Sequence, residues 1–96
     1  MAFETQFPDK DPSDRLDYTV SFARVFEDGE EIYSAIWTVP AGIVKETSFF
    51  GANTATIVLS GGTAGQTYRL GLDVTTNQGS PARIYSRDFR IKVKEL

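Results

Sequence analysis

The sequence predicts an all-β domain built from two layers of antiparallel strands. Apolar and polar residues alternate with a period of two in about seven short stretches, which is the pattern of strands with one buried face. Turn-forming residues separate these stretches, and no window repeats apolar residues at helical spacing over three turns. We therefore predict an antiparallel β-sandwich, with a small antiparallel β-barrel as the alternative.

Residues 1–16 differ from the rest of the chain. The alternation between Phe3 and Phe7 permits a short edge strand, and Pro8 and Pro12 then interrupt regular pairing because proline has no N–H to donate. We expect residues 1–16 to form an extended arm or edge strand, and residues 17–96 to form the sandwich domain.

Two strands are expected in residues 17–39. The first covers residues 17–26 and places on one face Tyr18, Val20, Phe22 and Phe26. A turn at Asp28 and Gly29 follows. The second covers residues 32–39 and places on one face Tyr33, Ala35, Trp37 and Val39.

Four further strands are expected in residues 43–50, 54–60, 67–75 and 83–93. The apolar–polar alternation is clearest in two of these strands. One face of the strand at residues 67–75 carries Tyr68, Leu70, Leu72 and Val74, and one face of the last strand carries Phe89, Ile91 and Val93. The glycine-rich residues 61–65 predict a loop with positive φ angles, and residues 77–79 predict a turn.

Two aromatic residues favour the immunoglobulin-like form of the sandwich. Trp37 lies in mid-strand on an apolar face, where such domains place a core tryptophan. Tyr68 follows the glycine-rich loop, at the position of a tyrosine corner, whose hydroxyl bonds to nearby backbone. The predicted fold class is therefore an immunoglobulin-like antiparallel β-sandwich of about seven strands.

Composition excludes several classes of function. Ten Lys and Arg against thirteen Asp and Glu give a net charge of −3, which argues against binding to nucleic acid or an anionic membrane. The chain has no Cys and no His, so disulfides, the usual zinc and haem ligands and Cys–His or Ser–His pairs are absent. We expect no cofactor, no metal and no catalytic residue. No apolar run predicts a signal peptide or a membrane span.

Two acidic clusters are best interpreted as solvated turns. Asp9, Asp11, Asp14 and Asp17 begin like a calcium loop, but the positions for the loop glycine and the final glutamate hold Asp14 and Val20. Glu27, Asp28, Glu30 and Glu31 lie beside a predicted turn, where we expect water to reach all of them. A charged turn that protects a sheet edge is favoured there over carboxylate catalysis.

Candidate contact residues come from three places in the chain. Phe49 and Phe50 are consecutive in a predicted strand, so one of them should face solvent. Tyr85 and Arg87 precede Phe89 on the inner face of the last strand and are residue types favoured at interfaces, although a frayed strand start is a slightly better interpretation of them. The predicted interface set is Phe3, Phe7, Phe49, Phe50, Tyr85 and Arg87.

Several segments together resemble one protein family. They are Lys10-Asp-Pro-Ser-Asp-Arg-Leu-Asp-Tyr18, Trp37-Thr-Val-Pro-Ala-Gly42, Ala55-Thr-Ile-Val-Leu-Ser-Gly-Gly-Thr-Ala-Gly-Gln-Thr-Tyr68, Thr75-Thr76 and Arg87-Asp-Phe-Arg-Ile-Lys-Val93. In this order, over nearly the whole chain, they resemble short proteins of tailed bacteriophages and prophages described as phage fibre–tail adaptor or tail-associated proteins. The chain departs from that family at Ser21-Phe22, where an acidic–aromatic pair is usual, and in the longer stretch of residues 77–82.

The resemblance implies a non-enzymatic virion structural protein that docks or joins tail or head–tail components. Its partners would be other phage structural proteins, with a homo-oligomer left open, and it would be found in the virion or in the bacterial cytoplasm during phage assembly. The arm of residues 1–14 could add a strand to a neighbour. The alternative is a free-standing adhesion or carbohydrate-binding module with an aromatic platform such as Phe49, Tyr85 or Tyr33.

Overall fold

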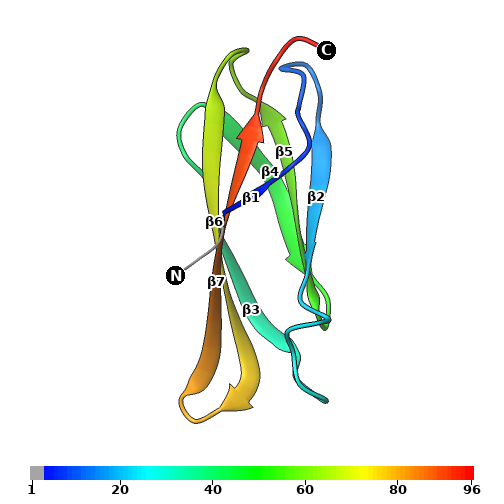
Figure 1. Cartoon of the computed structure of the whole chain (residues 1–96), viewed down its shortest axis with the longest axis vertical. Coiled ribbons are helices and arrows are strands. Elements are labelled where there is room, and N and C mark those ends of the chain that lie inside the picture. Colours follow the sequence, from blue (N-terminus) through cyan, green and yellow to red (C-terminus); the bar gives the residue numbers. More distant parts are fainter. Residues whose placement is uncertain (1–3) are drawn as a thin grey trace.

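The computed structural model describes residues 4–96, with side chains from Gln6 onward, as two stacked β-sheets (Figure 1). The strands are β1 (Glu4–Gln6), β2 (Leu16–Ser21), β3 (Ile32–Thr38), β4 (Ile43–Phe50), β5 (Thr54–Gly61), β6 (Thr67–Gly79) and β7 (Ala82–Lys92). One sheet has the order β1-β7-β6-β3 and the other has the order β2-β5-β4. No described residue belongs to a helix that could cross a membrane.

The strand order is that of an immunoglobulin-like sandwich. β7, β6 and β3 are neighbours in one layer and β2, β5 and β4 in the other, as in the two sheets of that fold. All neighbouring strands are antiparallel except β1, which runs parallel to β7. The sheets do not close into a barrel, so the predicted sandwich is confirmed.

The core lies between the two sheets and contains the residues that the alternation predicts. Its fully buried members include Ala55, Ile57, Leu59, Leu70, Val74, Ile91 and Val93. Trp37 is buried among them, as predicted. The Tyr68 hydroxyl accepts a hydrogen bond from the Thr63 amide at 2.9 Å, which confirms the predicted tyrosine corner.

The glycine-rich corner before Tyr68 has the predicted positive φ angles. Gly62 has a φ of 93°, and a Cβ at this position would lie 2.8 Å from the Val93 side chain. No other residue could bring the backbone this close to the core without displacing that valine. The corner therefore depends on glycine for both its conformation and its packing.

The segment after β1 covers one lateral opening of the sandwich. The Phe7 ring stacks on Tyr18 of the three-stranded sheet at 4.7 Å and on Phe89 of the four-stranded sheet at 4.8 Å. Lys10 is fully buried, and its Nζ donates to the carbonyls of Asp11 and Gly61 at 2.9 and 2.6 Å. Residues 7–10 thus join both layers at the β1–β2 side.

The prediction that Tyr33 shares the inner face of its strand with Trp37 is wrong. The register between β3 and β6 shifts between Ile32 and Ser34, so Tyr33 is an extra residue on β3. This bulge reverses the alternation before it. The Tyr33 side chain is 77% exposed, and Ile32 is buried instead.

The first predicted strand is also shorter than its apolar pattern suggests. β2 ends at Ser21, and the amides of Val25 and Phe26 both donate to the Phe22 carbonyl, at 2.9 and 3.0 Å. The chain therefore turns, and Phe26 reaches the Phe22 ring from that turn, with centroids 5.3 Å apart.

The turn predicted at residues 77–79 lies farther along the chain. Asn77 donates its amide to the Glu31 carbonyl at 3.0 Å and accepts the Glu31 amide on Oδ1 at 2.8 Å. These bonds keep the chain extended as far as Gly79. The β6–β7 hairpin consequently projects beyond the sheets, at the same end as the loop of residues 22–31 (Figure 1).

One substitution made at two tyrosines should have opposite effects on stability. Tyr68→Phe removes the acceptor for the Thr63 amide and should lower the free energy of unfolding by about 1 kcal/mol. The Tyr18 hydroxyl is buried without a partner, so Tyr18→Phe should raise that free energy by about 1 kcal/mol. Urea denaturation of the wild type and both variants measures this difference. Destabilisation of equal size in the two variants would contradict the assignment.

Candidate docking surface at a sheet edge

A pocket opens on the side of the sandwich opposite Phe7, between the edge strands β3 and β4. It has a volume of about 300 Å³ and is lined by Ala35, Trp37, Ser48, Phe49 and Phe50. We call these five residues the edge pocket. Mostly apolar and aromatic walls at the surface are typical of a place where a partner inserts a side chain.

Phe49 and Phe50 form the exposed wall of the edge pocket. Phe49 and Phe50 are 58% and 44% exposed, so both face solvent, whereas the alternation predicts one. β4 pairs only with β5, and Ile43 is its only buried residue. Two aromatic rings therefore remain in water on a strand that the core hardly uses.

Trp37 forms the inner wall and carries a donor without an acceptor. The indole is 8% exposed, and its Nε1–H makes no hydrogen bond within the described part of the chain. A buried donor left unpaired costs about 1–3 kcal/mol. An acceptor brought by a partner would recover that free energy if the neighbouring side chains made room for it.

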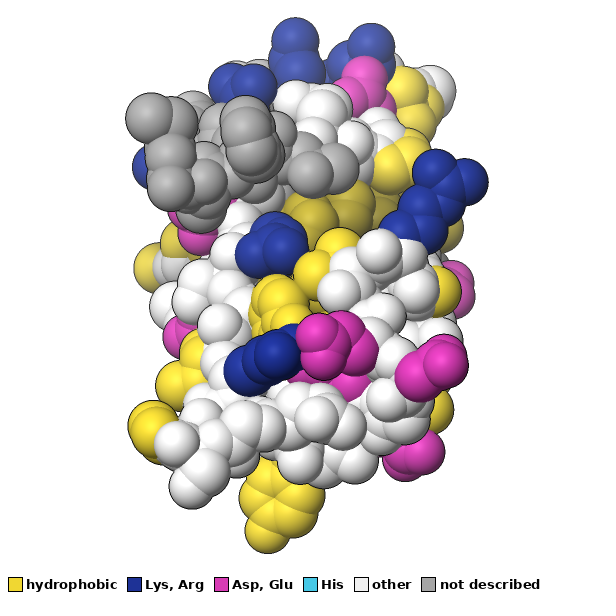
Figure 2. Space-filling model, turned by 60° about the horizontal axis from the view of Figure 1, so that its bottom comes forward, with side chains coloured by type: hydrophobic (Ala, Val, Ile, Leu, Met, Phe, Trp, Pro, Cys, Tyr) yellow, Lys and Arg dark blue, Asp and Glu magenta, His cyan; other side chains and the backbone are white. Residues whose placement is uncertain are grey.

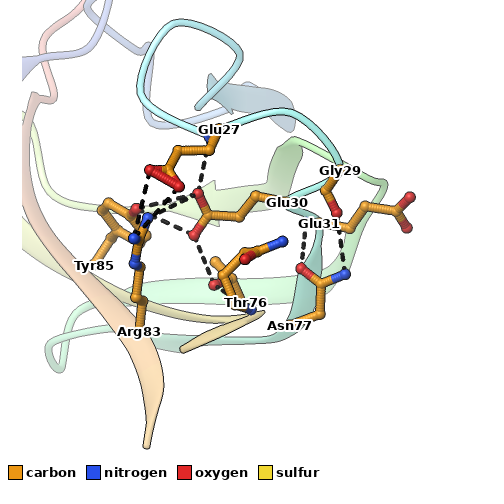
Figure 3. A network of polar contacts seen from close by, with 9 residues as sticks. Glu27, Gly29, Glu30, Glu31, Thr76, Asn77, Arg83 and Tyr85 are labelled. Atoms are coloured by element: carbon orange, nitrogen blue, oxygen red, sulfur yellow. Dashed lines mark hydrogen bonds and ion pairs between the residues drawn. The ribbon is translucent and has the colours of Figure 1, made fainter. Parts of the chain in front are cut away.

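The acidic loop beside the sandwich contains a carboxylate that water does not reach. The prediction that all four acidic residues are solvated is wrong for Glu30, which is only 5% exposed. Its oxygens accept hydrogen bonds from the Glu27 amide at 3.0 Å, the Thr76 hydroxyl at 2.8 Å and the Tyr85 hydroxyl at 3.1 Å (Figure 3). Arg83 pairs with it at 3.6 Å. The β6–β7 hairpin thus supplies partners that the loop sequence alone does not reveal.

These contacts stabilise the charged form of Glu30. Burial raises the pKa of the carboxyl, but the three hydrogen bonds and the Arg83 charge outweigh burial and leave the pKa below its usual value. The group is a structural anion that ties the loop of residues 22–31 to the hairpin. The Glu27 carboxylate pairs with the same Arg83 guanidinium, at 3.4 Å, so one arginine holds both acidic side chains.

Asp28 and Glu31, in the same loop, remain exposed and without an ionic partner among the described residues. The Glu31 carboxylate points away from the Glu30 network (Figure 3). Figure 2, which brings this end forward, shows acidic side chains grouped on it. The end of the molecule next to the start of β3 therefore carries negative charge that nothing in the described chain neutralises.

The structure distributes the six predicted interface residues among different environments. Phe7 lies in the core, and Phe3 lies outside the described residues. Tyr85 and Arg87 are half-buried, with the Arg87 guanidinium 5.7 Å above the Phe22 ring and 5.8 Å from the Tyr85 ring. Only Phe49 and Phe50 come together at an open surface.

Sequence reasoning missed the contribution of β3 to this surface. Ala35 and Ser48 belong to no sequence pattern that indicates a surface site. The alternation assigns Trp37 to the core alone. One available signal was the absence of any charged residue over β3. No ring contact among the described residues joins Tyr33, Phe49 and Tyr85, the aromatic residues named for a carbohydrate-binding module. No described group of three or more acidic side chains is placed to hold a metal ion.

Comparison with known families gives a match over residues 10–92 to a family described as podophage GP4 fiber-tail adaptor protein gp77. The chain belongs to this fibre–tail adaptor family. The match confirms the resemblance found in the sequence. It spans β2 to β7, so both layers of the sandwich and the edge pocket lie within the part that defines the adaptor family. Comparison with curated proteins gives no match.

The Glu30 network predicts a loss of stability in acid. The folded pKa of Glu30 lies below the ordinary value of 4.5, so its contribution to stability is fully present above pH 4.5 and is lost as the pH falls through the folded pKa. The urea midpoint of the wild type should therefore fall more steeply below pH 4.5 than that of Glu30→Gln. Glu31→Gln is the matched control, since its carboxylate lies outside the network, and it should behave as the wild type does. Parallel curves for wild type and Glu30→Gln would contradict the prediction.

Proposed function

We propose that this protein joins a tail fibre to the tail of a podophage virion by docking, without catalysing a reaction. The family supports the role of a structural adaptor. The observation that carries the proposal is the edge pocket, where two exposed phenylalanines lie beside a buried tryptophan whose N–H has no hydrogen-bond partner among the described residues. Its place of action would be the virion, with assembly in the bacterial cytoplasm.

The energetics of such a surface suit docking. Buried aromatic residues supply a large share of the binding free energy at protein interfaces, mostly from a few positions near the centre of the contact. Phe49 and Phe50 offer two such positions side by side, and the pocket beside them can receive a side chain from the partner. Repetition of the adaptor around a tail would add weak contacts through avidity.

The described N-terminal segment packs against its own domain and does not extend from it as a free arm. Its short strand β1 pairs with β7 of the same chain, and Phe7 fills the β1–β2 side of the core. Pairing this segment with a neighbour would first expose those apolar groups to water. We therefore assign docking to the β3–β4 side and a structural role to residues 7–10.

Loss of the two aromatic rings should weaken docking without unfolding the domain. In Phe49→Ala/Phe50→Ala, affinity for the co-encoded tail or fibre protein should fall by at least about 30-fold, as expected for interface residues worth about 2 kcal/mol or more. Ile84→Ala is the matched control, because Ile84 is also a large exposed apolar residue, at 66%, but lies away from the pocket. Calorimetric titration of purified proteins measures the affinities, and urea denaturation checks the fold.

Two results of these binding measurements would contradict the proposal. If neither the co-encoded fibre protein nor any co-encoded tail protein binds the wild-type chain, it is not an adaptor between them. If binding occurs and is unaffected by the double substitution, the docking surface lies elsewhere on the domain.

A further inference from the structure

Apart from the bulge at Tyr33, the edge strand β3 lacks the features that normally keep a sheet edge from pairing with another chain. Its sequence is Ile-Tyr-Ser-Ala-Ile-Trp-Thr, with no charge, no proline and no glycine. Tyr33 and Ile36 are 77% and 63% exposed. Natural edge strands are usually short, charged, bulged or covered, because an exposed apolar edge is a template for strand addition.

The other three edges of this sandwich carry such protection. The described part of β1 has three residues, and β2 carries Asp17 and lies on the side covered by residues 7–10. β4 carries Lys45 and Glu46 and shifts register between Lys45 and Thr47. β3 also shifts register, at Tyr33, but unlike β2 and β4 it carries no charged residue, and unlike β1 it is seven residues long. We therefore take β3 as the edge most open to pairing.

The backbone N–H and C=O groups of β3 that do not pair with β6 determine what kind of group can cover this strand. The strand pairs only with β6, and on its other side one backbone bond, from the Ile32 amide to the Ala52 carbonyl at 2.8 Å, is present within the described chain. Farther along β3, alternate residues direct N–H and C=O groups away from β6. Another extended backbone satisfies a row of such groups.

The charges near β3 determine which strand fits. Glu31 precedes the strand, and its exposed carboxylate and that of Asp28 have no ionic partner among the described residues. A partner strand with a Lys or Arg at this end would complement them. A second copy of β3 offers no cation, because the strand contains no charged residue.

We infer that β3 receives an extended, basic and apolar strand from the fibre or tail protein, which lengthens the four-stranded sheet by one strand. This inference rests on the proposed function and adds the chemistry of the partner. One face of the added strand would reach the edge pocket beside Phe49 and Phe50, and the other would lie against Ile36. Its basic residue would lie next to Glu31.

Amide hydrogen exchange of the ¹⁵N-labelled protein, free and in complex with the co-encoded partner, tests the pairing. Amides of β3 that point away from β6 should exchange at least about tenfold more slowly in the complex, as hydrogen-bonded amides do. The single indole resonance, from Trp37, should shift as well. Docking with no added protection in β3 would overturn the inference while leaving the proposed function intact, whereas absence of docking would count against both.

Two matched charge substitutions separate edge pairing from general surface contact. Ile36 and Ile84 are 63% and 66% exposed, but Ile36 is on the edge strand β3, whereas Ile84 is on β7, which β6 separates from β3. Ile36→Lys should weaken docking by at least about tenfold because a charge on an edge opposes strand addition, and Ile84→Lys should leave it within about twofold. Equal effects of the two would overturn the inference.

Overlapping synthetic peptides from the co-encoded fibre and tail proteins identify the strand itself. The binding peptide should alternate apolar residues and contain Lys or Arg, and it should bind Glu31→Lys more weakly than the wild type. N-methylation of its alternate amides should abolish binding in one register only. Binding of whole partner proteins without any peptide would indicate a folded surface, and a dimer of the free chain with protected β3 amides would indicate a second copy; either result overturns the inference.

Discussion

Two stacked sheets leave two lateral openings, and this chain covers only one of them within its described part. On the β1–β2 side, Phe7 stacks between Tyr18 and Phe89 and so joins one layer to the other. On the β3–β4 side no equivalent segment lies across the opening, and Trp37, Phe49 and Phe50 line a pocket there. The asymmetry follows from the chain order, because the N-terminal segment borders only the first side.

A buried lysine also helps to close the β1–β2 side of the sandwich. Lys10 places its Nζ between two backbone carbonyls, and burial lowers the pKa of its ammonium group although Asp14 and Asp11 act in the opposite direction. The carbonyl of Gly61 at the glycine-rich corner thereby gains a donor from the N-terminal segment. One side of the sandwich is thus held by packing and by polar contacts at the same time, and docking at the opposite edge need not disturb it.

The parts of the fold that the sequence predicts are those governed by local alternation. The strands predicted at residues 54–60 and 67–75, the core position of Trp37 and the corner at Tyr68 all follow from residue type and spacing. The bulge at Tyr33 and the burial of Glu30 depend on β6 and on Arg83, which are distant in sequence. The edge pocket likewise forms between strands of different sheets, so neither strand alone indicates it.

An edge strand without charge favours aggregation, so the retention of β3 needs a physical reason. Pairing through the backbone of β3 would let a partner gain several hydrogen bonds at once, while the edge pocket and the carboxylate of Glu31 would select which strand fits. The acidic loop also repels a second copy in a parallel arrangement, since both copies would bring Asp28 and Glu31 to the same end. The same charges can therefore oppose self-association and favour a basic partner, so one loop would serve both solubility and specificity.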